Sequence, residues 1–561
     1  MAPAPTPDLW PAMTLTEAHA RLTAPGAPFE VATADVRGIA MTVWRHVPAT
    51  AAEAFAAARA FGPREFLVLG EERITYDGFA RAVLKLSALL RERGLEKGDR
   101  VALAMRNLPE WPVVFLAGLL AGAIMVPLNA RWTGAELAYG ILDSGARFVF
   151  AYGERLSRLM HVAADLPPGV EQVFVTRAAS VPPGVTALED VTGAPAHWRD
   201  LPEGAMPDVA LLPEDDATIF YTSGTTGAPK GALGTHRALT TNIFARPFLA
   251  ARNALRDGTT AAARQGETAQ GVTLLAVPFF HVVGSLSVML PAMAAGGKLV
   301  LMAKFEPEAA LRLIEREKVA VTGGVPAIVR ALLEHPRLRE FDLSSLKLVS
   351  YGGAPSPADL PVRIAAAFAG ASAGNGWGMT ETSATCTSHS GRDYLHRRES
   401  CGPALPVSRI KVLVEGRAAA PGQVGELWAA PGHRPALSRR LGEDGRPGQH
   451  RRGRLLHHRG PRHRHGDPRR REHLLHRGGE CSDPSSGGGR CGAGGAGPSA
   501  AGRGARGPGA GARAGQRTGA ARFRGHPSGR LQGAGTYPDF AARAGAQRRR
   551  QAGAPRTGQG V

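Results

Sequence analysis

A loop rich in serine, threonine and glycine follows the apolar start of Ile219–Gly231 and ends in Lys230. Glycines let a backbone approach an anion closely, hydroxyls supply short hydrogen-bond donors, and a lysine supplies positive charge. The loop therefore predicts a triphosphate cradle, although it lacks the G-x-x-x-x-G-K-[ST] spacing of the Walker type. A surface linker, the alternative, would seldom combine these residues directly after an apolar strand. The expected phosphate contacts are Thr222, Ser223, Gly224, Thr225, Thr226, Gly227 and Lys230.

A second polar cluster lies at Asn375–Thr382. A triphosphate needs a hard cation, and hard cations prefer carboxylate oxygen, which Glu381 offers. Thr380 can hydrogen-bond a phosphate, and Trp377 presents a flat face on which an adenine could stack. On its own Glu381 would be a solvated surface acid, but within this cluster it predicts a Mg²⁺ ligand.

Apolar runs typical of strands alternate with helical patterns between residues 65 and 430, which predicts an α/β architecture with largely parallel sheets. The expected strands are Arg100–Met105, Phe148–Tyr152, Val173–Thr176, Thr273–Val277, Lys298–Leu301 and Leu346–Ser350. The expected helices include Tyr76–Arg93 and Glu308–Lys318. Two later strands, Val407–Glu415 and Val424–Ala429, are expected around a turn at Pro421 and Gly422. Residues 1–50 predict a loosely organised N-terminal segment.

The uncharged stretch Trp111–Leu128 is about long enough to cross a membrane. It contains two prolines and two glycines, and its pattern favours a helix that runs into a buried strand. No signal peptide is evident at the N-terminus. Four cysteines at irregular spacing indicate neither a disulfide framework nor a zinc site. These features predict a cytoplasmic protein without a membrane span.

Two further stretches, Pro278–His281 and Tyr351–Pro355, complete a pattern. With the phosphate loop and the Asn375–Thr382 cluster, they stand in the order found in the adenylate-forming family. This family comprises acyl-CoA synthetases, aryl-CoA ligases, peptide-synthetase adenylation domains and luciferases. The chain resembles it over roughly residues 65–430, and the phosphate loop and the Thr-Glu motif are the most specific parts.

The resemblance implies that a carboxylate attacks the α-phosphate of ATP to give acyl-AMP and pyrophosphate. Coenzyme A then accepts the acyl group, and a carrier-protein thiol stays open as the alternative acceptor. Catalytic roles fall to Lys230, Thr380 and Glu381, with Glu381 as the Mg²⁺ ligand. Further ATP contacts are expected at Gly352, Gly353, Ala354, Asn375, Gly376, Trp377, Gly378 and Met379.

The resemblance assigns the acyl pocket to four residues, namely His281, Gly323, Gly324 and Tyr351. These residues do not distinguish a fatty from an aromatic acid. For His281 a core histidine is the alternative, because one histidine in an apolar run is weak evidence for a site. The expected fold is a large adenylation domain over 51–430, in which helices flank sheets beside a small β-rich subdomain.

The net charge of +20 is confined to the end of the chain. Residues 430–561 hold 27 Arg, no Lys and 7 Asp or Glu, whereas the residues before them hold 41 basic and 41 acidic side chains. The body is therefore neutral and predicts no nucleic-acid binding of its own. The tail is rich in Arg, Gly, Pro and His and could not bury enough apolar surface to fold, which predicts disorder.

The tail also departs from the family pattern. After Gly425–Trp428 the family continues with a Thr-Gly-Asp motif, a hinge, a Gly-Gly-Glu-Asn segment and a terminal lysine. None of these motifs is recognisable in residues 431–561, which stand where the family has a small α+β domain. The nearest piece is Gly478–Glu480, followed by Cys481 instead of asparagine.

A frameshift explains this departure. Read one base later, the codons of Gly453–Arg462 permit Asp-Gly-Phe-Phe-Thr-Thr-Gly-Asp-Leu. Those of Arg477–Ser482 permit Gly-Gly-Glu-Asn-Val, and those of Gln547–Ala552 permit Asn-Ala-Ala-Gly-Lys. A genuine basic tail that binds RNA or DNA is the alternative. The absence of lysine and the few aromatic residues of the tail argue against that alternative.

Overall fold

The computed structural model describes residues 10–160, 169–222, 228–259, 270–414, 416–420 and 426–430. These all belong to one of the two units into which the chain divides; the other unit, residues 458–520, lies outside the described residues. The predicted Pro421-Gly422 turn and the whole tail from residue 431 also lie outside them.

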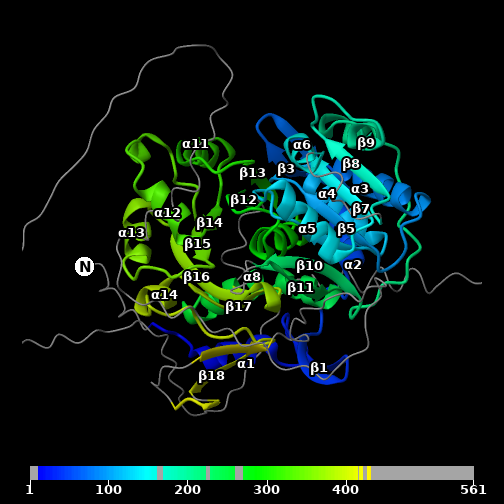
Figure 1. Ribbon diagram of the computed structural model, residues 1–561. Coiled ribbons are helices and arrows are strands. Elements are labelled where there is room, and N and C mark those ends of the chain that lie inside the picture. Colours follow the sequence, from blue (N-terminus) through cyan, green and yellow to red (C-terminus); the bar gives the residue numbers. More distant parts are fainter. Residues whose placement is uncertain are drawn as a thin grey trace, which may run out of the picture. The chain divides into compact units, whose positions relative to one another are not determined.

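A seven-stranded sheet has the order β11-β10-β6-β5-β7-β8-β9 (Figure 1). Its strands are β5 (Arg100–Ala104), β6 (Ile124–Pro127), β7 (Phe148–Tyr152), β8 (Gln172–Thr176), β9 (Val185–Ala187), β10 (Asp216–Thr222) and β11 (Lys230–Thr235). All neighbouring strands run parallel except β11, which folds back on β10 as a hairpin. Parallel strands are covered on both faces, which explains the continuous apolar runs in β5 and β7.

An eight-stranded sheet has the order β17-β16-β15-β14-β12-β13-β3-β4. Its strands are β3 (Glu65–Leu69), β4 (Glu72–Thr75), β12 (Val272–Leu275), β13 (Lys298–Leu301), β14 (Val321–Gly324), β15 (Leu348–Gly352), β16 (Ser372–Met379) and β17 (Ala384–Ser390). The six inner strands are parallel, and the two edge strands, β4 and β17, are antiparallel. The prediction of an α/β fold with largely parallel sheets is confirmed.

Helices flank both sheets (Figure 1). They are α2 (Ala51–Ala58), α3 (Tyr76–Glu92), α4 (Glu110–Leu120), α5 (Gly134–Ser144), α6 (Gly153–Met160), α7 (Leu188–Thr192), α8 (His236–Arg256), α10 (Leu290–Ala294), α11 (Pro307–Glu317), α12 (Pro326–Leu333), α13 (Leu360–Ala367) and α14 (Arg392–His396). Shorter helical turns are η1 (Arg59–Phe61), η3 (Pro195–Asp200), η4 (Val283–Met289), η5 (Leu338–Glu340) and η6 (Thr380–Thr382). Helix α8 contacts β10 and β11 of the first sheet and β17 of the second.

One apolar core is shared by the two sheets. Phe66 of β3, Leu103 of β5 and Leu299 of β13 belong to the same buried cluster. Helix α4 is buried on every side, and Trp111 stacks on Phe279 with ring centroids 4.8 Å apart. Burial of this much apolar surface is the main force that holds the sheets together.

The stretch Trp111–Leu128 forms the buried helix α4 followed by the buried strand β6, as the sequence predicts. None of the helices in the described part of the chain has both the length and the apolar character needed to cross a membrane.

The N-terminal segment is more ordered than the sequence predicts. Helix α1 (Leu15–Thr23) begins with a capping box between Thr14 and Glu17, and the strands β1 (Val31–Val36) and β2 (Ile39–Trp44) form a hairpin. Phe29 and Trp44 pack on the α8 residues Phe244 and Phe248. Segments that lie far apart in the sequence supply this packing, so local patterns do not reveal it.

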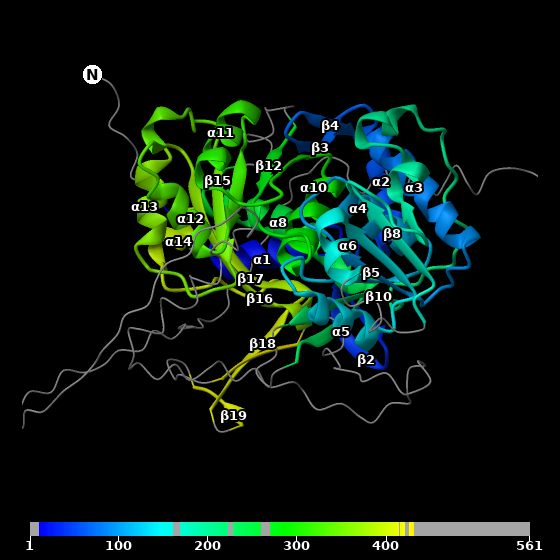
Figure 2. The same ribbon diagram turned by 45° about the horizontal axis from the view of Figure 1, so that its top comes forward.

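A small antiparallel sheet closes the described part of the chain. It consists of β18 (Arg409–Val414), β19 (Arg417–Ala418) and β20 (Glu426–Ala430), in the order β19-β18-β20. Figure 2 shows β18 and β19 apart from the two larger sheets. The two predicted late strands are thus confirmed, with a short additional strand between them.

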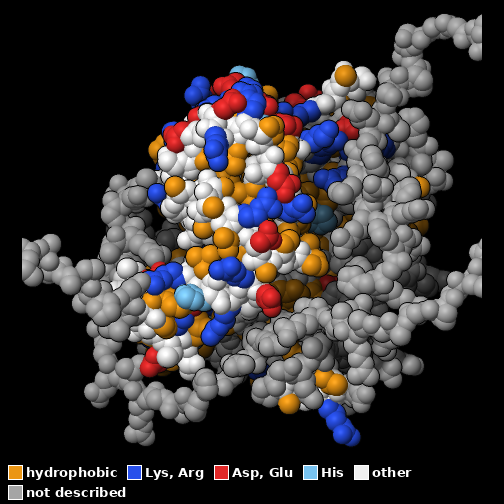
Figure 3. Space-filling model, turned by 90° about the vertical axis from the view of Figure 1, so that its left-hand side faces the viewer, with side chains coloured by type: hydrophobic (Ala, Val, Ile, Leu, Met, Phe, Trp, Pro, Cys, Tyr) orange, Lys and Arg blue, Asp and Glu red, His pale blue; other side chains and the backbone are white. Residues whose placement is uncertain are grey.

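Positive and negative side chains are intermixed on the face of the molecule shown in Figure 3. Ion pairs of the described residues include Arg337 with Glu308 at 2.6 Å and Arg363 with Glu334 at 3.1 Å. Such a surface agrees with the balanced charge of the residues before position 430.

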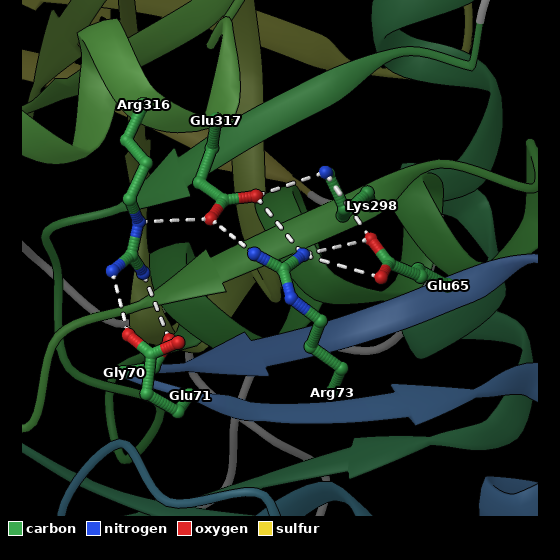
Figure 4. A network of polar contacts seen from close by, with 7 residues as sticks. All are labelled: Glu65, Gly70, Glu71, Arg73, Lys298, Arg316 and Glu317. Atoms are coloured by element: carbon green, nitrogen blue, oxygen red, sulfur yellow. Dashed lines mark hydrogen bonds and ion pairs between the residues drawn. The ribbon is translucent and has the colours of Figure 1, made fainter.

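An ion-pair network joins the early strands β3 and β4 to the later part of the second sheet (Figure 4). Glu317, at the end of α11, has a side chain only 3% exposed and lies 2.7 Å from Arg73 of β4 and 3.0 Å from Lys298 of β13. Burial alone would raise the pKa of Glu317, but hydrogen bonds from Arg73 and Lys298 lower it overall. The network therefore holds Glu317 as a carboxylate.

We expect Glu317→Gln to lower the free energy of unfolding at pH 7 by about 2 kcal/mol, because charge-assisted hydrogen bonds are lost. A carboxylate whose folded pKa is lowered stabilises above its unfolded pKa, and this contribution disappears as the pH falls through the folded pKa. The difference between wild type and variant should therefore shrink in acid. Urea unfolding at several pH values measures it. Glu71→Gln is the matched control, since Glu71 pairs with Arg316 but is 90% exposed. An equal effect of the two substitutions would contradict the expectation.

Candidate functional site

The β10–β11 hairpin carries the ends of the predicted phosphate loop. Thr222 and Lys230 face each other across the hairpin, and the Thr222 hydroxyl lies 3.4 Å from the Lys230 carbonyl oxygen. The Lys230 side chain is exposed and has no acidic partner among the described residues. Ser223, Gly224, Thr225, Thr226 and Gly227 lie outside the described residues.

The turn η6 presents Thr380 and Glu381, both partly exposed. Within the described part of the chain no side chain pairs with the Glu381 carboxylate. The turn ends in two residues with positive φ, Ser383 at 53° and Ala384 at 95°. Such backbone strain persists only where neighbours hold it. Asn242 of α8 supplies such a contact, because its amide donates to the Ser383 carbonyl at 2.7 Å.

The hairpin and the turn are neighbours. Both β10 and β11 contact η6. A Cβ atom added at Gly234 of β11 would lie 3.3 Å from the Ser383 hydroxyl. The fold thus packs the β10–β11 hairpin, at one end of which Thr222 and Lys230 pair, against the turn that carries Thr380 and Glu381, although more than 100 residues separate the two motifs.

Strand register places five more predicted residues side by side. Tyr351 of β15 pairs with Gly324 of β14 on one side and with Asn375 of β16 on the other. Gly352 pairs with Gly376 one residue further on. Gly324, Tyr351 and Gly352 lie at the carboxyl ends of the parallel strands β14 and β15, where open α/β sheets bind ligands.

Close backbone packing explains several glycines at this edge. A Cβ at Gly323 would lie 1.6 Å from the Ser350 carbonyl oxygen, and one at Gly352 would lie 2.6 Å from the Gly376 oxygen. A Cβ at Gly378 would lie 1.5 Å from the Ala384 oxygen. No side chain fits at these three positions, so only backbone atoms are available there to contact a ligand.

The remaining predicted nucleotide contacts surround this edge. Gly353 and Ala354 follow β15 and are exposed, whereas Trp377 and Met379 are partly buried at the end of β16. The Trp377 backbone N–H donates to the Thr387 hydroxyl at 3.2 Å. Hydrogen bonding across β16 and β17 therefore fixes the strand that carries Trp377.

Tyr351 contributes backbone rather than a side chain to this edge. Its ring is buried, and its hydroxyl lies 2.8 Å from the hydroxyl of Tyr394. Burial, and then the contact with Tyr394, raises the pKa of Tyr351. The phenol therefore packs in the core beside Tyr394.

His281 lies just before η4, and its side chain keeps exposed surface. Burial among surrounding protein atoms, followed by the nearby charge of Arg131, lowers the pKa of His281. The ring is therefore neutral at pH 7.

Two asparagines that the sequence analysis does not single out hold the site in place. Asn107, which is buried, donates to the Val277 carbonyl at 3.0 Å and accepts from the Phe279 N–H at 2.8 Å. It thereby fixes the turn that leads to His281, as Asn242 fixes the turn after Glu381. Their partners lie more than 100 residues away. Nothing in the sequence next to Asn107, just before α4, indicates such a long-range contact.

We expect Asn107→Leu to lower the free energy of unfolding by about 1–3 kcal/mol, since two buried backbone groups lose their partner. Hydrogen exchange should accelerate at residues 278–285 more than in the strands of the first sheet. Mass spectrometry of the exchanged protein measures this. Unchanged exchange at the turn would show that Asn107 does not position His281.

A hard cation has one candidate protein ligand here. The described residues contain no group of three or more His, Cys, Asp or Glu side chains that could hold a metal ion. Glu381 fits a Mg²⁺ ion that takes most of its ligands from phosphate oxygens and water, which is how Mg²⁺ binds with nucleotides.

Comparisons with known proteins identify the family of the chain. The family described as AMP-binding enzyme matches residues 54–433. A feruloyl-CoA synthase of Amycolatopsis sp is 34% identical over 362 residues, 64% of this chain and 65% of that protein. The 4-coumarate–CoA ligase CCL1 of Humulus lupulus is 29% identical over 361 residues, 63% of this chain and 62% of that protein. The chain thus matches less than two thirds of the length of either relative.

Solved structures share the fold. The N-terminal domain of FACL13 from Mycobacterium tuberculosis is 24% identical with a TM-score of 0.55, and the match covers 68% of this chain and 89% of that chain. The long-chain-fatty-acid-CoA ligase FadD1 of Archaeoglobus fulgidus is 23% identical with a TM-score of 0.59, covering 71% and 80%. With the family match over most of its length, this chain belongs to the AMP-binding enzymes.

Proposed function

We propose that this protein activates a carboxylic acid with ATP and transfers the acyl group to coenzyme A. The observation that carries the proposal is the meeting of the Thr222–Lys230 hairpin with the Thr380–Glu381 turn in an AMP-binding enzyme. The names of its relatives, feruloyl-CoA synthase and 4-coumarate–CoA ligase, support a CoA acceptor.

In the proposed first step a carboxylate oxygen attacks the α-phosphorus of ATP, and pyrophosphate leaves. Lys230 neutralises charge on the phosphates, Thr380 hydrogen-bonds the α-phosphate, and Glu381 holds the Mg²⁺ that accompanies ATP. In the second step the CoA thiol attacks the acyl carbonyl, loses its proton, and AMP leaves with the bonding electrons. Positioning and charge neutralisation supply most of the rate enhancement in such a reaction.

We infer that residues 431–561 replace a catalytic C-terminal domain through a frameshift. The family match ends at residue 433, close to where the Arg/Gly/Pro-rich composition begins. Without the ribose-binding aspartate and the terminal lysine of the family, the 561-residue chain binds ATP and acid but turns over slowly. Sequencing the gene across codons 425–440 tests the inference, since a base gained or lost there restores the motifs.

Enzyme assays test the function itself. Calorimetry with ATP and Mg²⁺ should detect binding to the 561-residue chain. A thioester assay should give at least about 100-fold more acyl-CoA once the shifted frame is restored. Near-normal turnover by the unaltered chain would refute the loss of the C-terminal domain. Product formation with a carrier-protein thiol, and none with CoA, would favour the alternative acceptor.

Nucleic-acid binding by the tail is the second candidate, because the tail carries the entire net charge of +20. Contacts to phosphates weaken steeply as salt rises. A salt-dependent gel shift that survives deletion of residues 1–430 would support this function. No shift at low salt would remove it.

The proposed location is the cytoplasm. Cys386 is buried and Cys401 is partly buried, and both are free thiols. Burial raises the pKa of Cys386, which keeps it protonated and unreactive. Free thiols of this kind are usual in a reducing compartment.

A further inference from the structure

Arg246, near the middle of α8, is a cation without a partner. Within the described part of the chain, it makes no hydrogen bond or ion pair. Two other arginines of the same helix are both engaged: Arg252 donates to the Ser388 carbonyl at 2.7 Å, and Arg256 pairs with Asp393 at 2.6 Å. Arg252 and Arg256 therefore each have a protein partner, whereas Arg246 has none among the described residues.

The position of Arg246 on the helix directs it to the seam between β17 and η4. Asn242 and Asn253, one turn before and two turns after it, hydrogen-bond β17. Leu239 and Ile243, on the adjoining face, belong to the core cluster that contains residues of η4. Residues three and four apart share one side of a helix. Arg246 therefore lies between the residues that contact β17, Asn242 and Asn253, and the residues that pack in the core with η4, Leu239 and Ile243.

This seam adjoins the candidate site. The Ser287 hydroxyl of η4 lies 3.1 Å from the Thr385 hydroxyl of β17, which joins the two elements directly. Thr385 follows the Thr380–Glu381 turn by a few residues, and His281 precedes η4. Arg246 is one helical turn beyond Asn242, which corresponds to about 6 Å along α8. A substrate whose reacting carboxylate lies at the turn would extend along the seam toward Arg246.

The surroundings of Arg246 make an unpaired charge costly. The residue is partly buried, and burial lowers its pKa. A cation that is partly removed from water is stabilised when an anion or several hydrogen-bond acceptors face it. A guanidinium matches a carboxylate particularly well because it can donate two parallel hydrogen bonds.

We propose that Arg246 binds a second carboxylate at the far end of the acid substrate, so that the protein selects dicarboxylic acids. This inference rests on the proposed function, because it presumes that the reacting carboxylate lies beside Thr380 and Glu381. Arg246 acts here as a specificity determinant and takes no part in the bond-making step.

Calorimetry tests the proposal on the full chain, saturated with a non-hydrolysable ATP analogue and Mg²⁺. Each dicarboxylate is compared with the monocarboxylate of the same length: succinate with butyrate, glutarate with pentanoate, adipate with hexanoate. At least one dicarboxylate should bind more tightly than its partner by about tenfold or more, as a charge-assisted pair contributes about 1.5–3 kcal/mol.

Variants assign this preference to Arg246. Arg246→Met should abolish it while leaving monocarboxylate affinity unchanged or higher, and Arg246→Lys should retain part of it. Arg330→Met, at an exposed arginine of α12, is the matched control and should keep the preference. Thermal melting of each variant verifies that it folds.

Two results overturn the proposal. If the wild-type chain binds the ATP analogue but shows no dicarboxylate preference, the role of Arg246 is refuted and the proposed function stands. If the preference persists in both Arg246→Met and Arg246→Lys, another residue recognises the second carboxylate. Failure of the wild-type chain to bind the ATP analogue at all would refute the proposed function together with this inference.

Discussion

Glu381→Gln is expected to remove most of the Mg²⁺ dependence of ATP binding. Glutamine keeps the size of the side chain but not its charge, and a hard cation binds an amide oxygen less strongly than a carboxylate. Glu381 has no competing partner in the described part of the chain, so its carboxylate is available to the ion. Loss of even an indirect metal contact costs about 10–100-fold in affinity, and a direct ligand should cost at least as much.

Calorimetric titration with ATP, in the presence and absence of Mg²⁺, measures the effect. The wild-type chain should bind ATP far better with Mg²⁺, whereas the variant should show little difference. Glu399→Gln, at an exposed acid in the loop after α14, is the matched control and should behave as wild type. A variant that retains the full benefit of Mg²⁺ would rule out Glu381 as the metal ligand.

Gly378→Ala is expected to destabilise the protein by more than about 4 kcal/mol, an effect reserved for severe steric or burial defects. The added Cβ would lie 1.5 Å from the Ala384 carbonyl oxygen, far inside van der Waals contact. The oxygen belongs to the backbone of the facing strand β17, so relief requires β16 and β17 to separate. The Thr380–Glu381 turn connects these two strands and would be displaced with them.

Denaturant unfolding and ATP titration measure the two consequences. Gly271→Ala is the matched control, because a Cβ there meets no atom within 4 Å and the residue does not have a positive φ. It should leave stability within about 0.5 kcal/mol of wild type. Equal stability of the two variants would mean that β16 and β17 are less closely packed than described above.

Strands that are buried on both faces were the part of the fold most accessible from the sequence. The predicted runs Phe148–Tyr152 and Lys298–Leu301 have the bounds observed for β7 and β13, because continuous apolar residues mark such strands. Strand β16 shows the opposite case. Its segment Gly374–Gly378 contains three glycines and has little strand propensity, and pairing with β15 and β17 on both sides makes it a strand.

The residues of the candidate site also differ in whether the sequence alone predicts their roles. Motif residues such as Lys230 and Glu381 were identifiable, since their types and local order indicate phosphate and cation chemistry. Asn107 and Asn242 were not, because their roles depend on backbone groups that only the folded chain brings near. Arg246 is a similar case, because the sequence around it does not indicate that none of the described acidic side chains pairs with it.

The pairing of β3 with β13 has a consequence for biosynthesis. Leu67 of β3 pairs with Leu299 of β13, which is synthesised about 230 residues later. At about 5–20 residues per second, the β3–β4 hairpin therefore waits on the order of ten seconds or more for its partner strand β13. During that time its unpaired edge is open to a chaperone or to another nascent chain. All strands of both large sheets, however, are synthesised before residue 391. A shifted reading frame after residue 430 therefore comes too late to prevent either sheet from assembling.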